Sequence, residues 1–142
     1  MFSGLFQTTY KKISFEDLQY ALQRIETFII INTLPAIEQD CLIKNTISYQ
    51  MEEKCINDLL NKYEFKSLKF IVYGKNAVDE SVEIKYKQLV SLGFTEIYIY
   101  SGGLFEWMLL QDIYGIEEFP TTRKVLDILK YKPSRTLTNY YI

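Results

Sequence analysis

The residues best placed to do chemistry follow a short apolar run, Phe70-Ile71-Val72, which is typical of a strand covered on both faces in a parallel sheet. The next residues form the candidate site, which consists of Gly74, Lys75, Asn76, Ala77, Val78 and Asp79. Open α/β sheets bind ligands at the carboxyl ends of their strands, so this loop lies where a ligand would bind. Its backbone N–H groups could accept a small anion beside Lys75, with modest affinity because Asp79 opposes negative charge.

The chain has two thiols that could act as nucleophiles, Cys41 and Cys55, and it contains no histidine. The absence of histidine excludes Ser–His and Cys–His nucleophile pairs, histidine general bases and histidine-ligated metals within this chain. Two cysteines make neither a disulfide framework nor a metal site, and no cofactor is indicated. Cys55 lies on the apolar side of a predicted helix and is interpreted as a core residue. A sulfur-transfer or redox role for either thiol would require a lowered pKa.

Length and composition indicate one domain. The chain has 142 residues, of which 48% are hydrophobic and 15% aromatic, enough to build a core. The net charge is −2 and the basic residues are scattered, which argues against nucleic-acid binding. No apolar run approaches the roughly 20 residues of a membrane span. The start lacks the features of a secretory signal, so we expect a cytoplasmic protein that does not enter a membrane.

Periodicity and capping residues predict alternating strands and helices. Ser14 and Asp17 resemble a capping box at the start of a helix over 15–25. Further helices are predicted over 50–63, over 80–92, from 103 onward and over 125–129, and strands over 27–32, within 41–48, over 68–73 and over 96–100. Asp79 or Ser81 is the expected cap of the helix at 80–92. This alternation favours a doubly wound α/β domain with a mostly parallel sheet.

The segment from Leu89 to Trp107 resembles the rhodanese-like domains. It has the pattern Leu-x-x-Leu-Gly-Phe, a strand, and then Gly102-Gly103 followed by x-x-x-Trp, as in that family. Upstream, Ile31–Pro35 matches the end of the family's "D-x-R" strand, and Leu42–Ile47 matches its "h-I-x-G-A-h" element. The resemblance spans about residues 14 to 113. It implies a single rhodanese-like α/β domain over 14–131, with a mostly parallel central sheet of four or five strands flanked by helices. Residues 1–13 would form an N-terminal arm and residues 132–142 a C-terminal tail.

The chain departs from the family at the position of the nucleophile. Active members carry a cysteine directly after the central strand, and its thiolate accepts sulfur while loop amides stabilise the negative charge. Here Gly74 takes that position, and the matching loop through Asp79 contains no Cys, Ser or Arg. The Asp and Arg of the "D-x-R" element are replaced by Asn32 and Leu34. The resemblance therefore implies no catalytic residue, no sulfurtransferase activity and no phosphatase activity.

These observations favour a catalytically inactive rhodanese-like domain, a pseudoenzyme that acts as a protein- or anion-binding module through the Gly74–Asp79 loop. Two alternatives stay open. One is a sulfurtransferase or redox protein that uses Cys41 or Cys55, and the other is a structural or assembly component of a particle. The loop and the Gly-Gly-Leu-Phe-Glu-Trp element are similar to those of small proteins encoded by large DNA viruses, which implies the host cytoplasm or the virion. The expected partner is a protein, and neither nucleic acid nor a membrane is expected.

Overall fold

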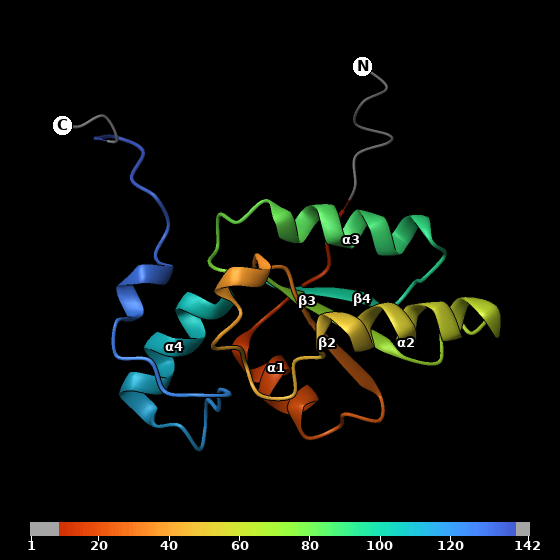
Figure 1. Cartoon of the computed structure of the whole chain (residues 1–142), viewed down its shortest axis with the longest axis horizontal. Coiled ribbons are helices and arrows are strands. Elements are labelled where there is room, and N and C mark those ends of the chain that lie inside the picture. The colour runs from red at the N-terminus through yellow and green to blue at the C-terminus, as the bar shows by residue number, and fades with distance from the viewer. Residues whose placement is uncertain (1–8, 139–142) are drawn as a thin grey trace.

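Four strands form one sheet in the computed structural model, which describes residues 9–138 (Figure 1). They are β1 (Lys12–Ile13), β2 (Phe28–Asn32), β3 (Lys69–Tyr73) and β4 (Ile97–Tyr100). Their order across the sheet is β1-β4-β3-β2, and every neighbouring pair is parallel. The expectation of a mostly parallel sheet with four or five strands is confirmed, with four strands in the described part of the chain.

Within residues 9–138, four α-helices cover the two faces of the sheet (Figure 1). They are α1 (Phe15–Leu22), α2 (Tyr49–Asn61), α3 (Ser81–Ser91) and α4 (Gly103–Tyr114). Leu18 of α1 and Trp107 of α4 share a core with Tyr73 on one face, and Leu59 of α2 packs in a second core with Val72 on the other. The chain is therefore a single α/β domain with helices on both faces of a parallel sheet, as the alternation of elements predicts.

The central strand β3 is apolar along its length because both of its faces are covered. Phe70 and Val72 belong to the core under α2 and α3, while Ile71 and Tyr73 belong to the core under α1 and α4. Each of these four side chains is at most 1% exposed. Successive strand residues point to opposite faces, so a strand buried on both sides has no polar face. Polar side chains that could contact a ligand therefore follow β3, in the loop after Tyr73.

Helix starts follow the capping residues of the sequence, with one exception. Ser14 and Asp17 form the predicted capping box at the start of α1. Glu80 occupies the N-cap position of α3 and makes no side-chain hydrogen bond there. The capping bond comes from Asp79, one of the two expected residues, whose carboxylate accepts the Ser81 N–H from one position before the N-cap. The chain turns sharply enough before α3 to bring this carboxylate back into the loop.

Residues 41–48 do not form the predicted strand. Ile43 and Thr46 take part in isolated bridges only, because side-chain hydrogen bonds fix the segment in place of a ladder. The Tyr73 hydroxyl accepts the Ile43 N–H at 3.1 Å and lies 2.6 Å from the Thr46 hydroxyl, which donates to the Ile43 carbonyl. Asn45, between them, has a positive φ of 70°. The result is a turn pinned to the central strand rather than a further strand of the sheet.

Within residues 9–138 there are two short 3-10 helices, η2 (Ala36–Glu38) between β2 and α2 and η3 (Ile128–Tyr131) after α4. η3 begins three residues later than the helix predicted over 125–129. The predicted N-terminal arm ends in β1, its residues 1–8 lie outside the described residues, and so do residues 139–142 of the predicted tail. None of the helices between residues 9 and 138 is long and apolar enough to span a bilayer.

Candidate functional site

The Gly74–Asp79 loop joins the end of β3 to α3 at the C-terminal edge of the sheet. The start of α4 packs directly on it, because the Leu104 N–H donates to the Gly74 carbonyl and the Phe105 N–H donates to the Lys75 carbonyl, both at 2.9 Å. The Gly102-Gly103 turn thus brings the N-terminus of α4 onto the backbone of the candidate loop. The first two carbonyl groups of the predicted site are thus hydrogen-bonded to the N-terminus of α4.

The carboxylate of Asp79 lies inside the loop and accepts hydrogen bonds from the loop itself. Its Oδ2 accepts the Lys75 N–H at 2.9 Å. Its Oδ1 accepts the Ser81 N–H at 3.0 Å and the Ser81 hydroxyl at 2.6 Å. Hydrogen bonds of this kind to an ionised carboxylate are the strong ones in proteins. An internal anion therefore already uses donor groups that a bound anion would need.

The same carboxylate fills the space in front of Gly74. A Cβ atom added at this position would lie 2.6 Å from Asp79 Oδ2 and 2.5 Å from the Cγ2 atom of Val82. Gly74 is itself buried and does not have a positive φ. A larger residue here would therefore have to displace the side chains of Asp79 and Val82, while the conformation of the backbone does not demand glycine.

Asn76 fixes the middle of the loop and is 8% exposed. Its Nδ2 donates to the Tyr131 carbonyl at 3.0 Å, and its Oδ1 accepts the Val78 N–H at 3.1 Å. One amide side chain thus ties the loop both to itself and to η3. The sequence singled out Asn76 only as a loop member, since no local pattern identifies a partner 55 positions away.

Lys75 forms an ion pair with Glu38 of η2. Their Nζ and Oε1 atoms are 2.8 Å apart, and both side chains are about a third exposed. Such a partly exposed pair contributes little to stability, because water competes for both charges. Its effect on the site is that the cation beside the loop already has a carboxylate partner.

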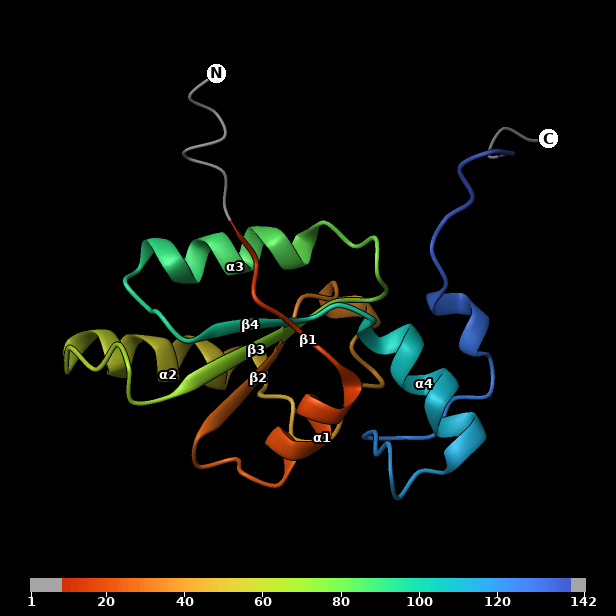
Figure 2. The same cartoon turned by 180° about the vertical axis from the view of Figure 1, so that it is seen from behind.

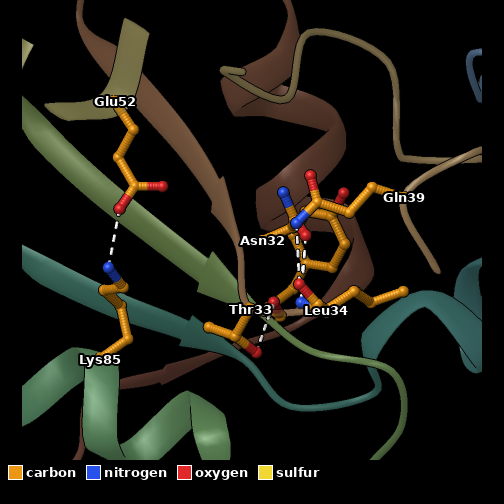
Figure 3. A network of polar contacts seen from close by, with 7 residues as sticks. Asn32, Thr33, Leu34, Gln39, Glu52 and Lys85 are labelled. Carbon is orange, nitrogen blue, oxygen red and sulfur yellow. Dashed lines mark hydrogen bonds and ion pairs between the residues drawn. The ribbon is translucent and has the colours of Figure 1, made fainter. Parts of the chain in front are cut away.

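A second group of polar side chains continues this edge of the sheet toward α2 and α3 (Figure 3). Asn32 Oδ1 accepts the Leu34 N–H at 3.0 Å, so the residue that the resemblance aligns with the family's Asp caps the turn after β2. The Thr33 and Ser81 hydroxyl oxygens lie 2.7 Å apart, within hydrogen-bond distance, which links this turn to Asp79. Further along, Lys85 and Glu52 form an ion pair at 2.7 Å between α3 and α2 (Figure 3).

The two cysteines, Cys41 and Cys55, have raised rather than lowered pKa values. Cys41 is fully buried, and its thiol donates to the Arg123 carbonyl at 3.2 Å. Burial raises the pKa of the Cys41 thiol. Burial, with a smaller effect of Asp58, raises the pKa of Cys55 on α2. A thiolate nucleophile needs the opposite shift. Among residues 9–138 there is also no group of three His, Cys, Asp or Glu side chains that could hold a metal ion.

The sequence did not identify a set of exposed apolar side chains around the loop, here called the edge cluster, which consists of Ile37, Tyr49, Val78 and Ile84. They line three adjoining clefts: Glu38 is a wall residue of the first and the middle cleft, and Ser81 is a wall residue of the middle and the third. The middle cleft, of about 560 Å³, is lined by Val78 and by the loop residues Lys75, Asn76 and Asp79. Exposed apolar residues that gather around clefts at one edge are typical of interaction surfaces. Local periodicity could not reveal them, because they come from four separate segments.

Comparisons with solved structures place this geometry in a known class. The solution structure of the rhodanese-like domain of the Alr3790 protein from Anabaena has a TM-score of 0.56 at 20% identity and covers 94% of this chain and 92% of its own. Ygr203w, a yeast protein tyrosine phosphatase of the rhodanese family, has a TM-score of 0.59 at 16% identity over 86% and 99%. The Saccharomyces cerevisiae single-domain sulfurtransferase RDL2 has a TM-score of 0.54 at 13% identity over 76% and 96%. No family model and no curated protein matches the sequence.

The molecule is thus a parallel α/β domain with its candidate loop at the C-terminal edge of the sheet. Its fold is that of the rhodanese-like domains, as the Gly102–Trp107 element predicted. The catalytic descriptions of Ygr203w and RDL2 belong to those two proteins, because identities of 13–16% show a shared fold alone.

Proposed function

We propose that this chain is a catalytically inactive rhodanese-like domain that binds another protein at the C-terminal edge of its sheet. The observation that carries the proposal is the position of Asp79. Its carboxylate accepts the Lys75 and Ser81 N–H groups and occupies the space in front of Gly74, the position that the resemblance aligns with the reactive cysteine of active rhodanese-like domains. A loop with no nucleophilic side chain lacks the reacting group that group transfer needs, and its internal anion occupies two of the N–H donors that would stabilise a developing negative charge.

The edge cluster supports protein binding over anion binding. Ile37 is 91% exposed and Ile84 is 69% exposed, so water contacts large apolar side chains that a partner would bury. Lys75 is paired with Glu38, and the Lys75 and Ser81 N–H groups already bond to Asp79. An incoming anion would have to displace one carboxylate and compete with another. A protein partner would need neither change.

The absence of catalysis is tested by turnover assays with thiosulfate plus cyanide and with a phosphate monoester. We expect rates equal to those of heat-denatured protein. A clear rate that disappears in Cys41→Ala or in Cys55→Ala would instead establish the alternative of a thiol-based sulfurtransferase. Titration with thiosulfate or sulfate in the same buffer should give no saturable change in the amide resonances of the loop.

The binding face is tested with two matched charge insertions. Ile84 on α3 belongs to the edge cluster, and Ile113 on α4 does not, yet both side chains are 69% exposed. A partner captured by the unmodified protein should be lost with Ile84→Lys and kept with Ile113→Lys. Equal capture by both variants would place the interaction on another surface. Thermal unfolding of the two variants controls for folding.

A further inference from the structure

A second surface of the molecule is unrelated to the loop and lies at the opposite end of the sheet. On the face that α1 and α4 cover, Ile30, Tyr73 and Tyr100 are buried at the C-terminal half of the strands. At the N-terminal half of the same face, Phe28 and Tyr98 are only half-buried. α1 has eight residues and is therefore about 12 Å long. The starts of β2 and β3 reach beyond it, as Figure 2 shows.

This uncovered part of the sheet is hollowed into a groove of about 200 Å³. Phe28, Ile71 and Tyr98 come from three neighbouring strands and form its floor. Ile13 of β1 and Tyr20 of α1 form its sides. We call it the sheet groove. Its lining is mostly carbon, which distinguishes it from the polar clefts at the edge of the candidate loop.

Cationic side chains surround the aromatic rings of the sheet groove. The guanidinium carbon of Arg24 lies 3.6 Å from the centre of the Tyr20 ring. The ammonium groups of Lys69 and Lys11 lie 5.8 Å and 5.7 Å from the centres of the Phe28 and Tyr98 rings. A cation within about 6 Å of an aromatic ring is attracted by it and is held in place. The groove therefore combines an apolar floor with positive charge at its margin.

The carboxylates at the groove are already hydrogen-bonded. Asp17 lines it, and its Oδ2 accepts from the backbone N–H and the hydroxyl of Ser14 in the capping box. Glu96 accepts the hydroxyl of Tyr98 at 3.2 Å. Asp17 and Lys69 both line the groove, and the three cations and two carboxylates together leave one positive charge around it. Lys11 and Arg24 already donate to the Thr95 and Tyr20 carbonyls, so Lys69 is the cation in the lining that an anionic group would meet.

We propose that the sheet groove binds a small apolar organic anion, a flat ring system or short hydrocarbon body that carries one carboxylate or sulfonate group. The apolar body would lie against Phe28, Ile71 and Tyr98, and the anionic group would face the ammonium of Lys69. The volume suits one or two fused rings. It is too small for a helix of a protein partner, whose diameter with side chains is about 10–12 Å.

The test uses 8-anilinonaphthalene-1-sulfonate, a fluorescent aromatic anion, and the full chain. We expect saturable binding with one molecule per chain. Lys69→Gln should weaken it roughly threefold or more, because it removes the cation at the groove. Tyr20→Ala, a change at an exposed helix position, should also weaken it and serves as the second variant if Lys69→Gln folds poorly. Lys54→Gln on α2, which covers the other face of the sheet, is the matched control and should bind as the unmodified protein does.

Two further measurements separate the parts of the proposal. N-phenyl-1-naphthylamine, an uncharged probe with a similar ring system, should bind equally to the unmodified protein and to Lys69→Gln. A similar loss with both probes would overturn the role of charge. Amide shifts caused by the sulfonate probe should concentrate at Phe28, Ile71 and Tyr98. Shifts concentrated at Ile113, on the exposed apolar face of α4, or an absence of saturable binding, would overturn the site.

Discussion

Gly103 lies directly against the backbone of Gly74. Its φ is +68°, and a Cβ atom built on it would lie 2.8 Å from the Gly74 carbonyl oxygen and 2.9 Å from the backbone nitrogen of Asn76. Two requirements therefore meet at this residue, a left-handed conformation and a close approach of two main chains. The approach is what lets the first turn of α4 donate hydrogen bonds to the loop carbonyls.

Replacing Gly103 by alanine should consequently destabilise the protein by more than a left-handed glycine position alone would explain. Gly115 provides the control, because its φ is +103° and a Cβ there would meet no atom within 4 Å. We expect Gly115→Ala to lower the free energy of unfolding by about 1–3 kcal/mol, because its φ of 103° and ψ of 158° lie in a region that glycine almost alone adopts. Gly103→Ala should cost about 2 kcal/mol more, because rigid backbone atoms must move. Urea unfolding of both variants measures the difference, and equal losses would show that the loop yields to the methyl group.

The sequence predicts Gly103 as a turn residue, but it does not predict that Gly103 lies against the backbone of Gly74 and Asn76. Strand and helix periodicity located β3, β4, α3 and α4 to within about two residues. Periodicity carries no information about which backbone a glycine must approach. The prediction of a strand within 41–48 failed for a related reason. The Tyr73 hydroxyl accepts the Ile43 N–H, which in a strand would be bonded to a neighbouring strand.

Tyr73→Phe should show how much the hydrogen bonds of the Tyr73 hydroxyl contribute to the free energy of unfolding. The substitution removes the acceptor of the buried Ile43 N–H and the neighbour of the Thr46 hydroxyl, and leaves a buried donor without a partner. The expected cost is about 1–3 kcal/mol in the free energy of unfolding. Tyr114→Phe, at a position that is 65% exposed, is the control and should change stability by less than about 0.5 kcal/mol. A small cost at Tyr73 would mean that the turn at Asn45 rearranges to find another acceptor.

Stability should fall in alkaline solution because of two buried tyrosines. Burial raises the pKa of Tyr73 and of Tyr100, and for Tyr100 the hydrogen bond to Glu106 adds to the effect. The unfolded chain releases these protons near pH 10, whereas the folded chain keeps them. The contribution of both groups is therefore complete below about pH 10 and is lost as the pH rises further. Urea midpoints measured between pH 8 and 11 should decline more steeply for the unmodified protein than for Tyr100→Phe, with Tyr114→Phe behaving as unmodified.

The candidate site divides into a part that the sequence contains and a part that only the fold reveals. Gly74 at the end of the central strand and the acid at Asp79 are both readable along the chain. The sequence treats Asp79 as a charge that opposes a bound anion. In the structure the Asp79 carboxylate itself takes the place of a bound anion. The chain turns back between Val78 and Ser81 and brings this side chain onto the Lys75 N–H. A conformation of this kind depends on Asn76 and its bond to Tyr131, which are distant in sequence.

The carboxylate of Asp79 should suppress thiolate formation by a cysteine placed at position 74. Gly74→Cys alone places its Cβ 2.6 Å from Asp79 Oδ2, so the thiol must push against a carboxylate whose charge disfavours a thiolate. Asp79→Ala added to Gly74→Cys removes that carboxylate and frees the Lys75 and Ser81 N–H groups to bond to sulfur. We expect the apparent thiol pKa to stay at or above about 8.5, the value of a free cysteine, in Gly74→Cys and to fall below it in the double variant.

The measurement is the rate of iodoacetamide labelling against pH, in a background of Cys41→Ala and Cys55→Ala so that one thiol reports. Glu80→Ala combined with Gly74→Cys is the matched control, because it removes an exposed carboxylate next to Asp79 that makes no side-chain cap bond to α3. If the lowered pKa comes from the freed N–H groups, Asp79→Ala should shift it and Glu80→Ala should shift it much less. Equal shifts would mean that net charge alone acts on position 74. A pKa that stays high in both variants would mean that the loop N–H groups do not point toward Gly74, and the carboxylate of Asp79 would then owe its place to the start of α3 alone.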